Sequence, residues 1–238
     1  MRKFLLVAAL VALVWGAQAQ ESGFGIRASV NLSSLKDKYD GKVDEGESKS
    51  DYETDFKNLV GFKIGVIYDW GLSESFYIQP GLYFTTRGAK LEEKEAEEDY
   101  SYKYEEKWKM NYLQLPILAS YRIALSDKVK WQFNAGPYFA CGLGGKVKWE
   151  SSESYDGESD TEKGDYKIFG TAGEDDEEEK GGLKRFDAGL SFGTGVSINK
   201  FYIGLSYDLG LSNIADKKQW EDSKLRNRNF SIGIGYNF

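Results

Sequence analysis

The last ten residues, 229–238, read Asn-Phe-Ser-Ile-Gly-Ile-Gly-Tyr-Asn-Phe. Large apolar side chains occupy every second position from Phe230 to Phe238, and small or polar residues lie between them. Successive side chains of a β-strand point to opposite faces, so this period of two predicts a strand with one apolar and one small, polar face. The ending therefore predicts a β-protein, and further segments of the same kind would fix its size.

Seven further segments show the same alternation, with apolar residues on one face and glycine, serine, amide or charged residues on the other. These segments are residues 24–32, 62–70, 76–84, 113–123, 131–141, 186–198 and 201–209. The connections between them are alternately short and long. Residues 71–74, 125–128 and 199–200 are short turns, whereas residues 33–57, 89–107, 149–184 and 212–226 are long. The chain is thus expected to contain eight strands in antiparallel order.

The first residues have the pattern of a secretory signal. Arg2 and Lys3 precede an apolar stretch over residues 4–15, and Ala17-Gln18-Ala19 is a small-x-small cleavage site. The apolar stretch is shorter than the roughly 20 residues of a membrane-spanning helix. We expect residues 1–19 to be a signal peptide and residues 20–238 to form one barrel domain.

A soluble antiparallel sheet would show similar alternation, with its apolar face on a core. The segments are long enough to cross a bilayer as tilted strands, and long external loops with short periplasmic turns are the expected asymmetry of a membrane barrel. Aromatic residues also gather at both strand ends, as interface anchors do. At one end these are Trp70, Phe76, Tyr121, Trp131, Phe201 and Phe238, and at the other Phe62, Phe84, Phe139, Phe186 and Phe230. The predicted fold is all-β: a transmembrane up-and-down antiparallel β-barrel of eight strands with long acidic extracellular loops, in the outer membrane of a Gram-negative bacterium.

The inward face of such a barrel would be polar. Its charged and amide residues are Arg27, Lys63, Arg122, Lys130, Asp69, Asp187, Asp208, Gln79, Gln114, Gln132 and Asn134. Eight strands enclose an interior just wide enough for side chains to fill, and buried charges need partners. We therefore expect a polar plug, with a narrow passive channel for small solutes as the alternative.

Several segments resemble an outer-membrane β-barrel "porin family" known best from the Bacteroidetes. Gly-Ile-Arg-Ala-Ser-Val-Asn-Leu at 25–32 resembles its first strand, Tyr-Leu-Gln-Leu-Pro at 112–116 its "YLxxP" strand, and residues 207–213 its "Y-x-x-G-L-x-N" segment. The segments Tyr77-Ile78-Gln79-Pro80-Gly81 and Ala135-Gly136-Pro137-Tyr138 are similar to two more of its strands. The resemblance implies the fold and the location, and no defined activity.

Catalytic chemistry has little support in the sequence. The chain has no histidine and one cysteine, Cys141, which falls on the predicted lipid-facing side of its strand. Histidine is the usual catalytic base beside a serine nucleophile and the commonest transition-metal ligand. We expect no enzyme activity, no catalytic, cofactor-binding or metal residue, and no cofactor.

The predicted external loops are acidic, most strongly at residues 92–99 and 174–179. Two interpretations stand: a surface ligand or cation site, with Asp156, Glu158, Asp160 and residues 175–179 as oxygen donors for Ca²⁺, or a solvated, self-repelling surface. An acidic surface argues against nucleic acid as a partner. We expect a monomer that contacts outer-membrane lipid, is delivered to the barrel-assembly machinery by its last strand ending at Phe238, and has a structural or surface-interaction role through its loops.

Overall fold

The computed structural model describes residues 22–39, 41, 54–97, 100–156, 158–170 and 180–238, and the predicted signal peptide lies outside them. In this part of the chain, no helix is long and apolar enough to span a membrane. The strands are β1 (Gly23–Lys36), β2 (Lys57–Gly71), β3 (Phe76–Ala96), β4 (Tyr100–Ala124), β5 (Val129–Tyr155), β6 (Glu158–Phe169), β7 (Lys180–Leu183), β8 (Phe186–Ile198), β9 (Phe201–Gly210) and β10 (Arg226–Asn237).

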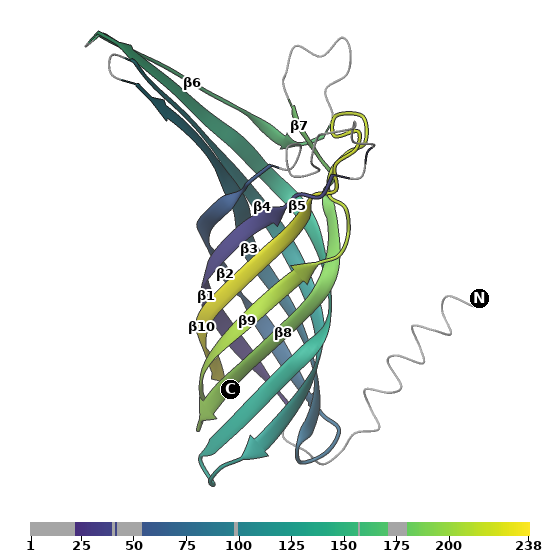
Figure 1. The fold of residues 1–238 in the computed structure, drawn as a ribbon. Coiled ribbons are helices and arrows are strands. Elements are labelled where there is room, and N and C mark those ends of the chain that lie inside the picture. The colour runs from purple at the N-terminus through teal and green to yellow at the C-terminus, as the bar shows by residue number, and fades with distance from the viewer. Residues whose placement is uncertain (1–21, 40, 42–53, 98–99, 157, 171–179) are drawn as a thin grey trace, which may run out of the picture.

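Eight of these strands close into a ring, as the sequence predicts (Figure 1). The order β4-β3-β2-β1-β10-β9-β8-β5 is joined at its ends by pairing of β4 with β5. The first and last strands are antiparallel neighbours from Gly25↔Asn237 to Lys36↔Arg226. Closure leaves the ring without a free edge, which is the requirement for a sheet inside a bilayer. The remaining strands, β6 and β7, extend the sheet beyond the ring.

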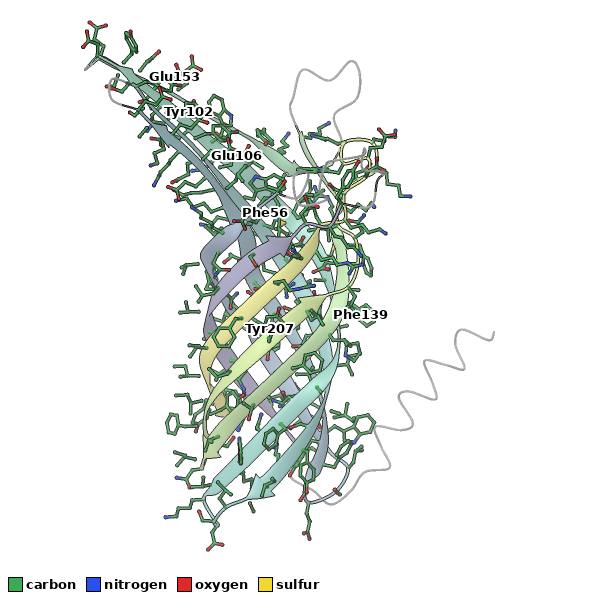
Figure 2. All side chains as sticks on the ribbon, in the orientation of Figure 1. Phe56, Tyr102, Glu106, Phe139, Glu153 and Tyr207 are labelled. Carbon is green, nitrogen blue, oxygen red and sulfur yellow. The ribbon has the colours of Figure 1, made fainter. Side chains whose placement is uncertain are left out.

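The two faces of the wall are those that the alternation predicts. Phe24, Ile203 and Ile234 are 63%, 56% and 64% exposed on the outside, and Cys141 is also exposed there. Figure 2 shows Phe139 and Tyr207 on this outer wall. Polar residues of the same strands are buried in the interior. An apolar exterior around a polar interior is the inverse of a soluble barrel and fits a lipid environment.

The short connections are also as predicted. Residues 72–75 join β2 to β3, residues 125–128 join β4 to β5, and residues 199–200 join β8 to β9. Asn199 has a φ of 51°. This left-handed conformation suits asparagine better than most residues, so the tightest of these turns has the appropriate side chain.

The structure differs from the sequence-based expectation in two of the long connections. Residues 89–96, 100–107 and much of the described part of 149–184 are strand, because β3, β4 and β5 continue beyond the barrel and β6 pairs with β5. We call this extracellular four-stranded sheet the blade: residues 90–96, 100–109, 146–155 and 158–167. It rises past the rim and leans away from the barrel axis (Figure 1).

The direction of the blade has a local cause at the rim. The pairing of β4 with β5 changes register between Asn111 and Tyr112, which face Gly144 and Gly142, so that Leu143 is an additional residue in β5. Such a bulge bends the strand and increases its twist. By contrast, β3 and β4 keep one register from Phe76↔Tyr121 to Ala96↔Ser101.

Candidate functional site

The interior of the barrel is crossed by an ion network centred on Arg87 of β3. Its Nη2 donates to Oδ2 of Asp208 at 2.8 Å and its Nη1 to Oδ2 of Asp187 at 3.2 Å. Lys63 Nζ lies 3.4 Å from the same Asp208 oxygen. The side chains of Arg87, Asp187 and Asp208 are at most 1% exposed. Two cations and two carboxylates therefore balance inside the wall, joining strands β2, β3, β8 and β9.

Hydrogen bonds from neutral side chains complete the surroundings of both carboxylates, Asp187 and Asp208. Asp208 accepts hydrogen bonds from Ser191 Oγ at 2.6 Å and from Gln114 Nε2 at 3.2 Å. Asp187 accepts from Tyr138 Oη and from Asn227 Nδ2, each at 3.0 Å. Buried carboxylates persist as ions only when charge and hydrogen bonds replace their hydration. The network thus cross-links most of the wall at one level.

A second polar layer lies toward the periplasmic end. Arg122 Nη2 lies 2.6 Å from Asp69 Oδ1, and Gln79 Nε2 donates to the same oxygen at 2.7 Å. The Arg122 guanidinium stacks over the ring of Tyr77, 4.0 Å from its centroid. Below this layer, a polar depression of about 420 Å³ opens at the periplasmic mouth.

Between the two layers lies a small cavity of about 70 Å³, lined by residues that include Arg27, Lys63, Tyr83 and Gln132. It has room for water molecules, each of which takes about 30 Å³ in the liquid. The buried Oδ1 of Asn134, which also lines it, has no protein partner and marks one place for such water. The cavity thus lies between the Arg87 network on one side and the Arg122–Asp69 layer on the other.

An apolar cluster, here called the cap, covers the extracellular end of the barrel. It combines residues of β1, β3, β4, β5, β6, β7 and the connections between β1 and β2 and between β9 and β10. The buried members are Leu35, Phe56, Ala89, Trp108, Met110, Tyr112, Tyr138, Ala140, Val147, Ile168, Phe169, Leu183, Ile214, Ala215 and Leu225.

The cap is tied together by aromatic and backbone contacts. Trp108 packs edge-on against Phe56 and Trp220, with ring centroids 5.2 and 5.5 Å apart. Trp220 Nε1 donates to the carbonyl of Gly181 at 3.0 Å. At Gly182, φ is +67°, and a β-carbon would approach Gln219 to 2.6 Å, so glycine is required for this turn. The described parts of several external connections are thus packed together over the barrel mouth.

The two faces of the blade differ sharply in charge. On the face that continues the barrel interior, called the acidic face, the described blade residues include seven carboxylates and no lysine. These are Glu93, Glu95, Glu106, Glu153, Glu158, Asp160 and Glu162, interspersed with Tyr100, Tyr102, Tyr104, Trp149 and Tyr155. Figure 2 shows Tyr102 and Glu153 along the blade and Glu106 nearer its base.

The opposite face, called the basic face, continues the lipid-facing exterior. With the adjoining Lys57 it has ten lysines and four carboxylates. The lysines are Lys57, Lys90, Lys94, Lys103, Lys107, Lys109, Lys146, Lys148, Lys163 and Lys167, and the carboxylates are Glu92, Glu105, Glu150 and Asp165.

Ion pairs within and between the strands connect these groups. Glu92 contacts Lys94 at 2.6 Å and Lys57 at 3.2 Å, and Glu105 contacts Lys90 at 2.6 Å and also Lys107. Hydrogen bonds from these lysines lower the pKa of both glutamates to about 2. Both carboxylates are therefore ionised throughout the physiological range, and each is already surrounded by ammonium groups.

The sequence-predicted lumen residues are placed as expected. Of the eleven, ten are buried or nearly so in the interior, and Lys130 lies at the periplasmic mouth. Arg87 was not on that list, although it continues the inward series Tyr77, Gln79, Gly81, Tyr83, Thr85 by one step. The alternation of inward residues along β3 could therefore have identified Arg87 as a lumen residue. It was not predicted, because Arg87 lies beyond the apolar part of that strand.

The structure does not bring together the described residues among the candidate calcium donors. Glu158 and Asp160 lie on the acidic face of β6, Asp156 lies in the turn before it, and residues 175–179 lie outside the described part of the chain. Among the described residues, no group of three or more Cys, Asp or Glu side chains is arranged to hold a metal ion.

Solved structures of outer-membrane proteins are similar to the chain. Ail, the attachment invasion locus protein of Yersinia pestis, solved with the heparin analogue sucrose octasulfate, is 16% identical, with 92% of this chain and 100% of Ail covered and a TM-score of 0.36. Neisserial surface protein A is 13% identical, with 92% and 100% covered and a TM-score of 0.37. OprG from Pseudomonas aeruginosa is 12% identical, with 93% and 98% covered and a TM-score of 0.42.

No curated protein is significantly similar to this sequence. A family model described as outer membrane protein beta-barrel domain matches residues 17–216, which is most of the chain. The closed ring of antiparallel strands, the apolar exterior and the polar interior agree with that match. The chain belongs to the outer membrane protein β-barrel domain family, and its location is the outer membrane of a Gram-negative bacterium.

Proposed function

We propose that this protein is a closed, non-conducting barrel that holds an ordered surface outside the cell for interaction with other molecules. The observation that carries the proposal is the Arg87 network beneath the apolar cap. A conducting pore needs a continuous hydrated path, and here paired charges and packed apolar side chains occupy successive levels of the interior.

The energetics favour a lasting closure. To open the lumen, Arg87 would have to leave two carboxylates that are at most 1% exposed. Removing one partner of such a buried set costs roughly 3–5 kcal/mol. A side-chain movement of that cost would be rare, so the network acts as a fixed cross-brace and not as a gate.

The second candidate is a narrow passive channel. It is favoured by one observation, namely the polar cavity of about 70 Å³ above the periplasmic depression of about 420 Å³. The cap weakens it, since solutes would also need a route through the apolar cluster. No catalytic step forms part of either proposal, because the chain has no histidine and Cys141 lies on the lipid-facing side.

Planar-bilayer recording of the refolded protein separates the two candidates. The closed barrel predicts no steady unit conductance for the wild type. The double variant Arg87→Ala/Asp208→Ala, which removes the cross-brace, serves as the comparison and should show occasional openings. Steady wild-type conductance that changes with Gln132→Ala, a substitution in the cavity wall, would overturn the closed barrel in favour of the channel.

The surface role rests on the blade and the cap. The blade is built of paired strands and has tyrosine and carboxylate groups on its acidic face. Aromatic side chains such as tyrosine make contacts at low entropic cost. A binding screen on intact cells should compare the wild type with Tyr102→Ser/Tyr155→Ser, using Lys217→Ser/Lys218→Ser on the connection between β9 and β10 as a control. Equal binding by all three proteins would show that the tyrosines of the acidic face do not contribute to binding.

A further inference from the structure

The lysines of the basic face are arranged in rows across the strands. Residues Lys57, Lys90, Lys107 and Lys148 lie directly opposite one another in β2, β3, β4 and β5. A second row, nearer the barrel, consists of Lys109, Lys146 and Lys167 in β4, β5 and β6. Like charges directly opposite each other destabilise a sheet. These rows therefore lower the stability of the isolated blade. An anion bound to the lysines would offset the repulsion between them.

Carboxylates within the blade compensate only part of this charge. Asp165 contacts Lys146 at 2.6 Å, and Glu150 contacts Lys163 at 3.2 Å. Glu92 and Glu105 are each already shared among three lysines. Among the described residues of the basic face, ten lysines against four carboxylates leave a formal excess of six positive charges, in a protein whose net charge is −7.

The position of this excess follows from the strand register. Because β3 and β4 keep one register throughout, the lysines of β4 lie on the same sheet face as Leu113 and Leu115, which face lipid. Lys109 is four residues beyond Leu113, about 13 Å along the strand and roughly 10 Å in height at the usual tilt. The headgroup layer starts where the hydrocarbon ends. Leu113 lies directly opposite Phe84 of the external aromatic belt, so the lower lysine row is roughly 10 Å above that belt and within reach of the headgroups.

The lean of the blade turns this face toward the bilayer. The outward face of a sheet that leans away from the barrel axis is directed away from the axis and down toward the membrane plane (Figure 1). The acidic face is correspondingly directed toward the cap and the exterior. Basic residues close to a membrane surface are attracted to anionic lipid headgroups, with a range of about one Debye length.

We propose that the basic face of the blade docks on the phosphorylated headgroups of the outer leaflet that surrounds the barrel. The lysine rows nearest the rim hold the phosphates, and this contact fixes the blade with its acidic, aromatic face outward. The proposal depends on the outer-membrane location and the blade geometry. It does not depend on the closed lumen. A conducting barrel would therefore leave this proposal intact, and a failure of the experiment below would leave the closed barrel intact.

Lysine footprinting tests the proposal on the whole protein. The protein is placed in nanodiscs of phosphatidylcholine with or without lipid A, and acetylation rates are read for each lysine by mass spectrometry. Lys107, Lys109, Lys146 and Lys148 should react about fivefold or more slowly with lipid A present, and high salt should restore their rates. Lys217 and Lys218, which are exposed on the connection between β9 and β10, should be unchanged.

Three results would overturn the proposal. Equal rates in the two kinds of disc would show that the lysines do not meet the headgroups. Equal protection of Lys217 would show only general crowding by lipid A. Protection by a soluble sulfated polysaccharide in phosphatidylcholine discs, with none from lipid A, would assign the face to a soluble polyanion instead.

A pair of matched variants separates the basic face from net charge. The first variant replaces Lys107, Lys109, Lys146 and Lys148 by Gln. The control replaces Glu93, Glu95, Glu153 and Glu162 of the acidic face by Gln. Both are checked for folding by the gel shift between unboiled and boiled samples. Amide exchange in the blade should then be slowed by lipid A in the wild type and the control, and not in the lysine variant. Slowing of the lysine variant equal to that of the wild type would contradict the docking.

Discussion

Replacement of Arg87 by Met tests whether the interior network is what holds the barrel closed. In the wild type, Arg87 and Lys63 balance Asp187 and Asp208 inside the wall. Without Arg87, Asp208 retains Lys63 at 3.4 Å, whereas the partners that Asp187 retains among the described residues, such as Tyr138 and Asn227, are neutral. One buried carboxylate is then left without a cation.

The expected loss follows from that uncompensated charge. Breaking a buried ion pair by removing one partner costs roughly 3–5 kcal/mol. Methionine has an unbranched, flexible side chain that can fill much of the vacated space, so the charge accounts for most of the loss. Addition of Asp187→Asn to the Arg87→Met variant restores neutrality and should recover roughly 1–3 kcal/mol. Lys63→Met should cost less than Arg87→Met, because Asp208 keeps the closer Arg87 contact at 2.8 Å.

Urea refolding titrations in lipid vesicles measure these differences, and the unboiled gel shift confirms that each variant folds. Two outcomes would refute the reasoning. A cost of Arg87→Met below about 1 kcal/mol would mean that water reaches the carboxylates and that the lumen is open. A further loss on adding Asp187→Asn would mean that hydrogen bonding, and not charge balance, holds this level of the barrel together.

Three further predictions follow from the wall and the blade. Leu205→Arg, on the lipid-facing side of β9, should destabilise the barrel by roughly 2–4 kcal/mol in the same titration, whereas the inward Ser206→Asn should cost much less; the reverse order would invert the assignment of faces. The carboxyl NMR resonances of Glu92 and Glu105 should titrate at about pH 2; because their folded pKa is lowered, their stabilisation of the blade is complete above about pH 4.5 and is lost as the pH falls toward 2. Protease added to whole cells should cut the connection between β3 and β4 and spare that between β2 and β3, and cleavage confined to the latter would mean an inverted topology.

The barrel could be predicted from the sequence because lipid and lumen impose opposite demands on neighbouring residues. Each membrane strand must alternate, as Phe201, Ile203 and Leu205 do against Gly204 and Ser206. The blade has no such contrast, since both of its faces meet water or polar groups. Its strands alternate instead between lysine and tyrosine or glutamate, a pattern without an apolar period and therefore easily taken for a loop.

The cap could not be predicted from the sequence for a different reason. Its contacts join residues that are far apart in the chain, such as Phe56, Trp108 and Trp220. Phe56 and Trp220 are isolated aromatic residues in polar connections, whereas Trp108 lies in β4, and nothing local shows that the three meet over one mouth. The partners of Arg87 were inaccessible for the same reason, because which inward residues share a level depends on the stagger of the strands around the barrel.

The lumen and the blade are linked by the strands that they share. Arg87 lies in β3 immediately below the blade, and β3 and β4 continue from the periplasmic turn to the blade tip without a bulge. A slip of one residue would move every side chain to the opposite face, so it would turn Arg87 toward lipid and Lys90 and Lys94 toward the acidic face. We therefore propose that the ion network does more than close the barrel. By fixing the register of β3 at the rim, it also sets which face of the blade continues the lipid-facing exterior and which continues the interior.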